Sequence, residues 1–299
     1  MSQGPPSAAP NQPRDSAGWS ASELAGDPHS HAGKQEKVRS MFAAIARSYD
    51  LNNRVHSLWR DQAWRRFAVK VSEVRAGESV LDCACGTGDL TIAFGRKLRQ
   101  DAGSARGAAA AGGGASAGAQ RGRLVGLDYT SEMLDIARVK GPAGAGIEWM
   151  QGDAQALPFA DASFDVVSIA FGIRNVQEPA RAIGEFRRVL RPGGRLVVLE
   201  FAEPRLAPVR WFNDVYCRRV MPRTATWISG DKSGAYRYLP KSVSTFVAPE
   251  SLKKMMEEAG FAAVRDWALS LGICRCYRAY VPTARRGGGG DGAQGSATR

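Results

Sequence analysis

A short apolar run that ends in a glycine turn constrains the fold of this chain more than any other feature. Residues 79–85 (SVLDCAC) have the length of a buried strand, and Gly86-Thr87-Gly88 follows them before a helix expected from Asp89 to about Leu98. Strand, glycine turn and helix in this order are typical of a nucleoside-binding loop in an α/β fold. Glycines at such a turn let the backbone approach a ligand closely and adopt positive φ angles.

The residues after the turn indicate a ligand without a phosphate group. No Gly-Lys-Ser/Thr follows the turn, so the segment is not a phosphate-binding P-loop. Asp89 would place a negative charge at the helix N-terminus, where a pyrophosphate would otherwise bind. We therefore expect a nucleoside, with Gly86, Thr87 and Gly88 among the residues that bind it.

A second strand, at 124–128, ends in an acidic residue that can bind a ribose. Asp128 follows Thr87 by 41 residues, or by 21 when the Gly/Ala-rich tract 102–121 is left out. A spacing of about 20 residues is expected for a carboxylate that accepts both ribose hydroxyls. Asp153 and Ala154, after a third strand, can contact an adenine through a carboxylate and a backbone N–H. The alternative is a plain tight turn with aspartates that cap helices.

The rest of the chain alternates strands with helices. Apolar runs predict strands at 147–151, 164–170 and 195–201, helices at 131–139, 178–190 and 249–259, and a closing hairpin of strands at 262–270 and 273–281. Residues 191–194 (RPGG) predict a turn. This order predicts an α/β, Rossmann-like, mostly parallel seven-stranded sheet with an antiparallel C-terminal strand. Helical and aromatic additions are expected before residue 79 and in 202–247.

Three segments lack any apolar pattern and divide the chain. Residues 1–35, 102–121 and 284–299 are rich in Gly, Ala, Ser or Pro, and we expect a disordered N-terminal arm, a loop insertion and a disordered tail. One domain of residues 36–283 remains. The chain has no run of roughly 18 apolar residues and no signal-peptide pattern, so a cytoplasmic protein is expected.

The cysteines predict neither a disulfide scaffold nor a metal site. Their number, 5, is odd, and two C-x-C pairs at 83/85 and 274/276 differ from the C-x₂₋₄-C spacing of zinc sites. Residues i and i+2 of a strand share one face, so each pair can point into the core. We expect free thiols and no metal.

The net charge of +12 is concentrated in two segments. Residues 36–70 hold eight basic and three acidic residues, and residues 205–241 hold eight basic and two acidic residues. In the second segment, basic residues alternate with Trp, Tyr and Phe, which favours peripheral contact with an anionic membrane. Nucleic acid is the competing partner, but no nucleic-acid-binding motif accompanies the charge, and we expect none.

Several motifs together resemble the UbiE/MenG family of class I S-adenosylmethionine-dependent methyltransferases, which methylate a ring carbon of polyprenylated quinols. The resemblance spans about residues 38–282. It rests on YDLN (49–52), VLDCACGTGDLT (80–91), AQALPF (154–159), FGIRNV (171–176), RVLRPGGRLVVLEFAEP (188–204) and YRYLPKSV (236–243). The glycine loop and the RPGG turn are common across the superfamily, whereas FGIRNV, LEFAEP and YRYLPKS single out this family.

The resemblance implies S-adenosyl-L-methionine as cofactor and a polyprenylated quinol as substrate. Thr87, Asp128, Asp153 and Ala154 fall on the family's cofactor-binding positions. Two departures stand out: Ala170 replaces a Ser that family members often have before Phe-Gly, and Ala84 replaces the common first Gly of the loop.

Arg174 and Asn175 follow the fourth strand, where open α/β sheets bind ligands. Methyl transfer to a ring carbon needs an electron-rich ring, and a phenol is mostly protonated at neutral pH. Our hypothesis is that Arg174 and Asn175 orient a water or the phenol oxygen for proton removal, as the resemblance also implies. The alternative is a buried salt bridge and a turn asparagine. Tyr49 can lie over the sulfonium through its ring face, or can simply be a core aromatic residue.

Of the activities that the resemblance implies, we expect C-methylation of demethylmenaquinol to menaquinol, although the motifs do not separate it from the ubiquinone pathway. The alternatives are the polyprenylated benzoquinol precursor of ubiquinone, another lipid or small-molecule acceptor, and a cofactor-binding scaffold without turnover in a quinone-synthesis complex. We leave open a homodimer, the polyprenyl length and the identity of the general base.

Overall fold

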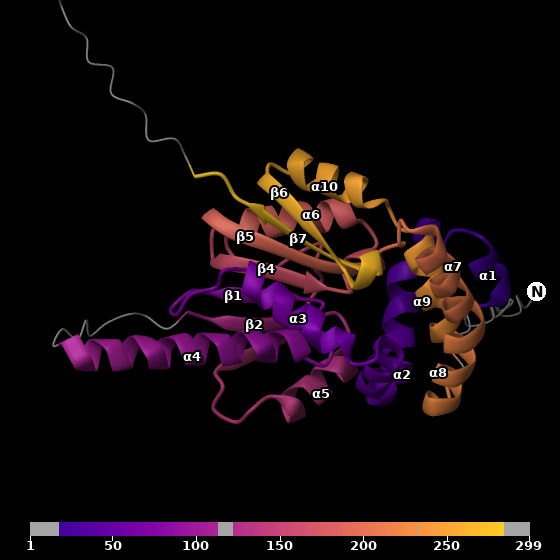
Figure 1. Ribbon diagram of the computed structural model, residues 1–299, viewed down its shortest axis with the longest axis horizontal. Coiled ribbons are helices and arrows are strands. Elements are labelled where there is room, and N and C mark those ends of the chain that lie inside the picture. The colour runs from indigo at the N-terminus through magenta and orange to yellow at the C-terminus, as the bar shows by residue number, and fades with distance from the viewer. Residues whose placement is uncertain (1–17, 113–121, 232, 284–299) are drawn as a thin grey trace, which may run out of the picture.

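A seven-stranded sheet forms the centre of the molecule. The computed structural model describes residues 18–112, 122–231 and 233–283 (Figure 1). The strand order is β3-β2-β1-β4-β5-β7-β6. The strands are β1 (Val80–Cys83), β2 (Leu124–Asp128), β3 (Ile147–Gln151), β4 (Phe164–Ala170), β5 (Leu190–Phe201), β6 (Ala262–Leu269) and β7 (Cys274–Tyr280). β1 to β5 are parallel and β7 is antiparallel to both neighbours, which confirms the predicted sheet.

Alternate residues of the central strands face two separate cores. One face packs against α6 (Pro179–Val189) and α10 (Pro249–Glu258), with Phe186 and Met256 fully buried. The other face packs against α3 (Arg60–Val71) and α4 (Asp89–Gly112). α5 (Ser131–Lys140) lies beside β2 and β3. The sheet order reverses between β1 and β4, and a ligand crevice forms outside the carboxyl ends of strands at such a point.

A helical cap lies beside the carboxyl ends of the parallel strands (Figure 1). It consists of α1 (Ala21–Ala25), α2 (Lys34–Ser57), α7 (Ala207–Val215), α8 (Met221–Ser229) and α9 (Ala235–Ser244), with the short helices η1 (Pro28–Ser30) and η3 (Tyr216–Val220). Trp19, Met41, Ile45 and Tyr238 form its own apolar core. Two further helical turns, η2 (Ile173–Asn175) and η4 (Ser270–Gly272), follow β4 and β6.

The prediction of a disordered arm over residues 1–35 was wrong for residues 18–35. Ser20 and Glu23 form a reciprocal capping box that starts α1. Trp19 is buried and stacks on Tyr238, with ring centroids 4.8 Å apart. The Ser-x-x-Glu signal is present in the sequence, but the partner of Trp19 lies more than 200 residues away. Residues 1–17 lie outside the described residues.

Two element boundaries also differ from the predictions. α4 continues through Gly112, so residues 102–112 of the expected loop insertion are helical, because alanine has the highest helix propensity. Residues 113–121 and the tail 284–299 lie outside the described part of the chain. β5 begins at Leu190, so the RPGG residues that we expected to form a turn lie within the strand. They form an irregularity opposite Phe164 and Val166, where the register of β4 and β5 shifts, and Gly193 there has φ +79°. Among the described residues, no helix combines the length and apolar character needed to cross a bilayer.

Candidate active site

A cavity lies between the carboxyl ends of the strands and the cap. The space between its walls is about 730 Å³, a figure that includes the part open to solvent. Its walls come from the glycine turn, the ends of β2, β3 and β4, and helix α2. The sequence-predicted residues that line it are Tyr49, Gly86, Asp128, Asp153, Ala154 and Asn175.

Asp128 is the carboxylate best placed to bind a ribose. Its two oxygens accept backbone N–H bonds from Gly86 at 2.7 Å and Thr130 at 2.8 Å, which fixes the carboxylate at the cavity wall. Burial raises the pKa of Asp128, although these N–H groups oppose the rise. Each carboxylate oxygen keeps a second lone pair, so two ligand hydroxyls can still be bound.

The floor of the cavity is a crowded contact between two turns. Ala84 has φ +48° and Phe171 has φ +57°, which is unusual for residues other than glycine. A Cβ on Gly172 would lie 2.5 Å from the Cβ of Ala84, so position 172 has no room for a side chain. Ala84, which replaces the common first glycine of the loop, therefore fits because the FGIRNV motif has a glycine, Gly172, opposite it.

Asp153 joins the cavity wall to the cap. One oxygen accepts a hydrogen bond from Gln35 of α2 at 2.8 Å, and the other accepts the backbone N–H of Gln155 at 2.9 Å. Ala154 is buried beside it and lines the cavity. An adenine-binding role for Asp153 would therefore involve Gln35, which the sequence did not single out.

Two predicted binding residues do not line the cavity. A Cβ on Gly88 would lie 2.4 Å from Cη2 of Trp149, so this glycine allows close helix–strand packing. The Thr87 hydroxyl donates to Asp50 at 2.6 Å and accepts from Lys140 at 3.0 Å. Thr87 is thus part of a polar network behind the glycine turn.

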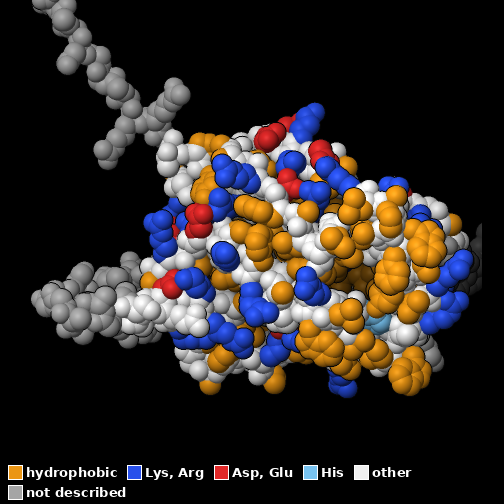
Figure 2. Space-filling model, in the orientation of Figure 1, with side chains coloured by type: hydrophobic (Ala, Val, Ile, Leu, Met, Phe, Trp, Pro, Cys, Tyr) orange, Lys and Arg blue, Asp and Glu red, His pale blue; other side chains and the backbone are white. Residues whose placement is uncertain are grey.

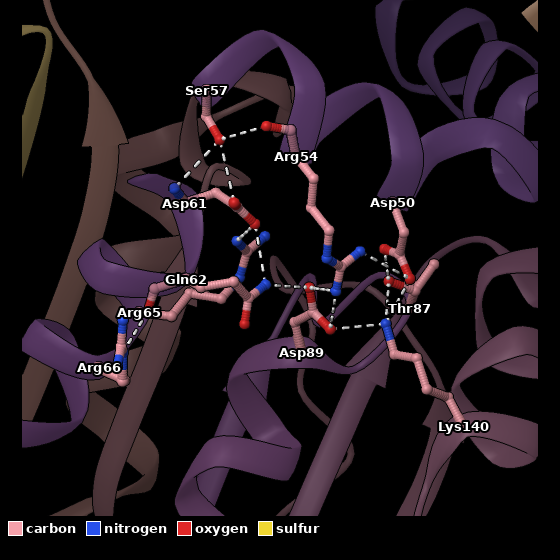
Figure 3. A network of polar contacts seen from close by, with 10 residues as sticks. All are labelled: Asp50, Arg54, Ser57, Asp61, Gln62, Arg65, Arg66, Thr87, Asp89 and Lys140. Atoms are coloured by element: carbon pink, nitrogen blue, oxygen red, sulfur yellow. Dashed lines mark hydrogen bonds and ion pairs between the residues drawn. The ribbon is translucent and has the colours of Figure 1, made fainter. Parts of the chain in front are cut away.

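This network connects α2 to the glycine turn (Figure 3). The Lys140 ammonium, at the end of α5, contacts Asp50 of α2 at 2.6 Å and Asp89 of α4 at 2.7 Å. Arg54 of α2 lies 3.2 Å from Asp89 and 3.7 Å from Asp50. Burial would raise the pKa of Asp89, but Arg65, Lys140 and Arg54 together lower it.

Arg174 lies behind the cavity wall. Its guanidinium pairs with Glu200 of β5, and its Nη1 donates to the Phe171 carbonyl at 2.9 Å. Nε donates to the Ser242 hydroxyl at 3.3 Å. Arg174 and Glu200 are both nearly fully buried. Arg174 therefore forms the buried salt bridge that we gave as the alternative, and its side chain does not line the cavity.

Asn175 does face the cavity. Its amide nitrogen donates to the Phe171 carbonyl at 3.1 Å, and its oxygen accepts from the Tyr238 hydroxyl at 3.1 Å. These two bonds fix the amide and leave one N–H and one oxygen lone pair for a ligand. The shared Phe171 carbonyl links the position of Asn175 to Arg174.

Tyr49 lines the cavity from α2, edge-on to Phe42 with ring centroids 5.8 Å apart. Burial raises the pKa of its hydroxyl. Other lining residues were not among the predicted site residues: Gln35, Val38, Arg39, Phe42, Tyr129, Met133, Phe171 and Gln177. Only tertiary packing brings α2 to this position. The described cysteines are free thiols.

Comparison with known proteins agrees with these features. Residues 30–281 match the ubiE/COQ5 methyltransferase family. A demethylmenaquinone methyltransferase from Thermus thermophilus is 44% identical over 234 residues, which cover 78% of this chain and 96% of that protein. The ubiquinone/menaquinone biosynthesis C-methyltransferase UbiE from Escherichia fergusonii is 36% identical over 251 residues, 83% of this chain and 91% of that protein.

Solved structures are similar in fold. The [4+2]-cyclase SpnF has a TM-score of 0.55 at 16% identity and covers 84% of this chain and 96% of its own. A SAM-dependent methyltransferase from Thermotoga maritima has a TM-score of 0.52 at 18% identity and covers 81% and 99%. Both support the Rossmann-like fold and nothing finer.

Proposed function

Because the chain belongs to the ubiE/COQ5 methyltransferase family, we propose that it is an S-adenosyl-L-methionine-dependent C-methyltransferase that converts demethylmenaquinol to menaquinol. The observation that carries the proposal is the 44% identity to a demethylmenaquinone methyltransferase, almost all of which this chain covers. The cavity at the reversal of the strand order, with Asp128, Asp153 and Asn175 after β2, β3 and β4, supports it.

The residues present fit the cofactor. Asp128 is held by two backbone N–H groups and keeps lone pairs for the ribose hydroxyls. Gly86 leaves the turn free of a side chain where it borders the cavity. Asp153 and the buried Ala154 offer a carboxylate and an apolar surface for the adenine. When bound, S-adenosyl-L-methionine supplies an electrophilic methyl group next to a positively charged sulfur.

In our proposal, Asn175 is the catalytic residue that touches the quinol. The quinol ring becomes a better nucleophile as its hydroxyl loses a proton, so a group that orients this hydroxyl or its accepting water promotes the reaction. The Asn175 amide is fixed by Phe171 and Tyr238, and its oxygen can accept a hydrogen bond from the quinol hydroxyl or from the water that takes up the proton. A fixed amide avoids reorganisation during the step.

Arg174 acts as a positioning residue in this scheme. It binds the same Phe171 carbonyl as Asn175 and connects it to Glu200 of the sheet. Helix α2 covers the cavity with Phe42 and Tyr49, which helps to exclude water from the reacting atoms. Tyr49 also offers a ring face to the positively charged sulfur.

The direct test uses purified protein, methyl-labelled S-adenosyl-L-methionine and anaerobically reduced demethylmenaquinol. Oxidised demethylmenaquinone and the demethylated benzoquinol precursor of ubiquinone are tested in parallel. We expect label in the reduced naphthoquinol and none in the oxidised quinone. A cofactor that binds without labelling any acceptor would contradict the proposal and favour another acceptor or a scaffold.

The benzoquinol of ubiquinone synthesis is the second candidate substrate. It is favoured by one observation, the 36% identity to a relative whose name includes both pathways. Label in both quinols would mean that one enzyme serves both substrates.

Variants separate the two roles. Asn175→Ala should lower kcat by about a hundredfold or more with little change in cofactor Kd. The control is Asn213→Ala, at a half-buried asparagine of α7, and it should change neither value. Arg174→Ala should destabilise the fold by about 3–5 kcal/mol, because it leaves Glu200 buried without its partner, and Arg174→Lys should restore part of that stability. Unchanged stability in Arg174→Ala would contradict this role of the buried ion pair.

A further inference from the structure

Two turns near the site expose large apolar side chains on strained backbone. Leu58 and Trp59 join α2 to α3 with φ 52° and 59°, and their exposed fractions are 79% and 60%. Leu271, between β6 and β7, has φ 58° and an exposed fraction of 67%. Left-handed backbone is unfavourable for such residues, and strain of this kind is concentrated at functional sites. Here it holds apolar groups in contact with water.

These turns lie side by side and next to the cap. Ser270 accepts hydrogen bonds from Arg60 at 3.3 Å and from Trp64 Nε1 at 3.0 Å, which joins the two turns. His56, at the end of α2, contacts the Tyr216 hydroxyl of η3 at 2.8 Å. The turns therefore continue into the α7–η3–α8 segment.

The α7–η3–α8 segment is amphipathic but leaves its apolar side uncovered. Pro208, Trp211, Phe212 and Val215 follow the spacing of one helix face, yet no residue of α7 or η3 is buried. Ala225 is the one buried residue of α8. Trp211, Phe212 and Trp227 are among the most exposed aromatic residues that the structure describes. A surface of this kind marks an interaction site.

Figure 2 shows hydrophobic side chains gathered over α7 and α8 and around a hollow beside them, with Lys and Arg side chains close by. We call the residues Leu58, Trp59, Trp211, Phe212, Trp227 and Leu271 the apolar rim. Exposed arginines lie in the same segments, at 60, 66, 210, 219 and 223. Asp214 is the one acidic residue of the helices from α7 to α8.

We propose that the apolar rim docks on the surface of an anionic lipid bilayer, with its aromatic side chains at the headgroup level. Tryptophan is enriched at membrane interfaces, and arginines next to an apolar helix face complement anionic lipids. A second copy of this chain suits the surface less well, because a two-fold interface would bring arginines against arginines. The inference rests on the proposed function, since a polyprenylated quinol is dissolved in the bilayer.

The docked orientation gives the rim a role in substrate transfer. Residues 58–59 directly follow α2, which lines the cavity, and Ser270 is hydrogen-bonded to α3 just beyond them. In this orientation, a quinol passes from the bilayer past α2 to the cavity without its apolar tail crossing bulk water.

The test is sedimentation of the full chain with vesicles of phosphatidylcholine, with and without phosphatidylglycerol. We expect binding to the anionic vesicles and at least about tenfold weaker binding to neutral ones. The triple variant Trp211→Ser, Phe212→Ser, Trp227→Ser should bind anionic vesicles about tenfold more weakly or worse. Val139→Ser is the matched control, because Val139 is 89% exposed on α5, outside the rim.

Charge is tested separately. Arg210→Glu with Arg219→Glu should weaken anionic vesicle binding and remove most of its salt dependence, whereas Arg96→Glu with Arg99→Glu on α4 should change it little. Undiminished binding by the triple variant would overturn the proposal. So would rim-dependent dimerisation in sedimentation velocity without vesicle binding.

Activity separates this inference from the proposed function. The triple variant should keep parent activity on a short-chain, water-soluble demethylmenaquinol and lose it on vesicle-embedded substrate. Equal activity of parent and triple variant on embedded substrate would contradict the role of the rim. Vesicle binding by a parent that methylates neither substrate would leave docking intact and refute the proposed function.

Discussion

Lys140 offers the sharpest test of how the cap is attached to the glycine turn. Its ammonium reaches three acceptors on three elements: Asp50 of α2, Asp89 of α4 and Thr87 of the glycine turn. Lys140→Met keeps most of the side-chain volume but removes the charge. Asp50 and Asp89 then face one another across the position of the ammonium, and α2 should be displaced from the cavity it lines.

The magnitude follows from the burial of the groups. The side chains of Lys140, Asp50 and Asp89 are 27%, 24% and 12% exposed, which lies between a surface pair and a buried pair. Breaking a surface pair costs about 0.2–1 kcal/mol and breaking a buried pair about 3–5 kcal/mol. Arg54 remains to neutralise both carboxylates, so we expect about 2 kcal/mol, or about 30-fold in cofactor Kd.

The assay is isothermal titration calorimetry with S-adenosyl-L-methionine, with thermal unfolding measured alongside it. Lys97→Met is the control, because Lys97 pairs with Asp101 within α4 and is 42% exposed. We expect this control to change Kd and stability very little. If Lys140→Met binds the cofactor as tightly as the parent, the network does not hold α2 over the cavity and the reasoning is refuted.

Three further substitutions test single groups. Asp128→Asn should raise cofactor Kd about tenfold or more in calorimetry, because hydrogen bonds to a charged acceptor contribute about 1.5–3 kcal/mol; unchanged affinity would exclude Asp128 as the ribose ligand. Burial raises the pKa of Asp82 from 3.8 to about 6, because the fold disfavours its charged form. The free energy of unfolding should therefore fall by an amount on the order of 3 kcal/mol as the pH rises from about 4 to above 6. Asp82→Asn should therefore gain stability relative to the parent between pH 4 and pH 7 in urea unfolding; a constant difference would refute this. Gly88→Ala should lower Tm through the clash with Trp149 and through strain at its φ of +84°, whereas Gly103→Ala on α4, which has free space, should not; equal Tm values would contradict the packing argument.

Features set by short segments could be predicted from the sequence. The strand–turn–helix unit around Gly86, the carboxylate of Asp128 at the end of β2 and the position of Asn175 after β4 all follow from local pattern and spacing. These residues line the cavity because parallel strands bring their carboxyl ends to one edge of the sheet.

Features set by contacts between distant segments could not be predicted in the same way. Arg174 was expected to face the ligand, but Glu200 lies beside it only because β4 and β5 are neighbours in the sheet. Gln35 reaches Asp153 only because α2 folds over the cavity. Thr87 occupies the motif position, yet its hydroxyl is turned toward Asp50 and Lys140.

The place of β7 has a consequence for how the chain folds during synthesis. β7 lies between β5 and β6, although β6 comes first along the chain. While residues 262–269 leave the ribosome, β6 has no strand to pair with, and the edge of β5 stays open until residues 274–280 follow. An open strand edge is a site of intermolecular pairing. The nascent protein is therefore exposed to such pairing until β7 is made, and the addition of β7 closes the open edge.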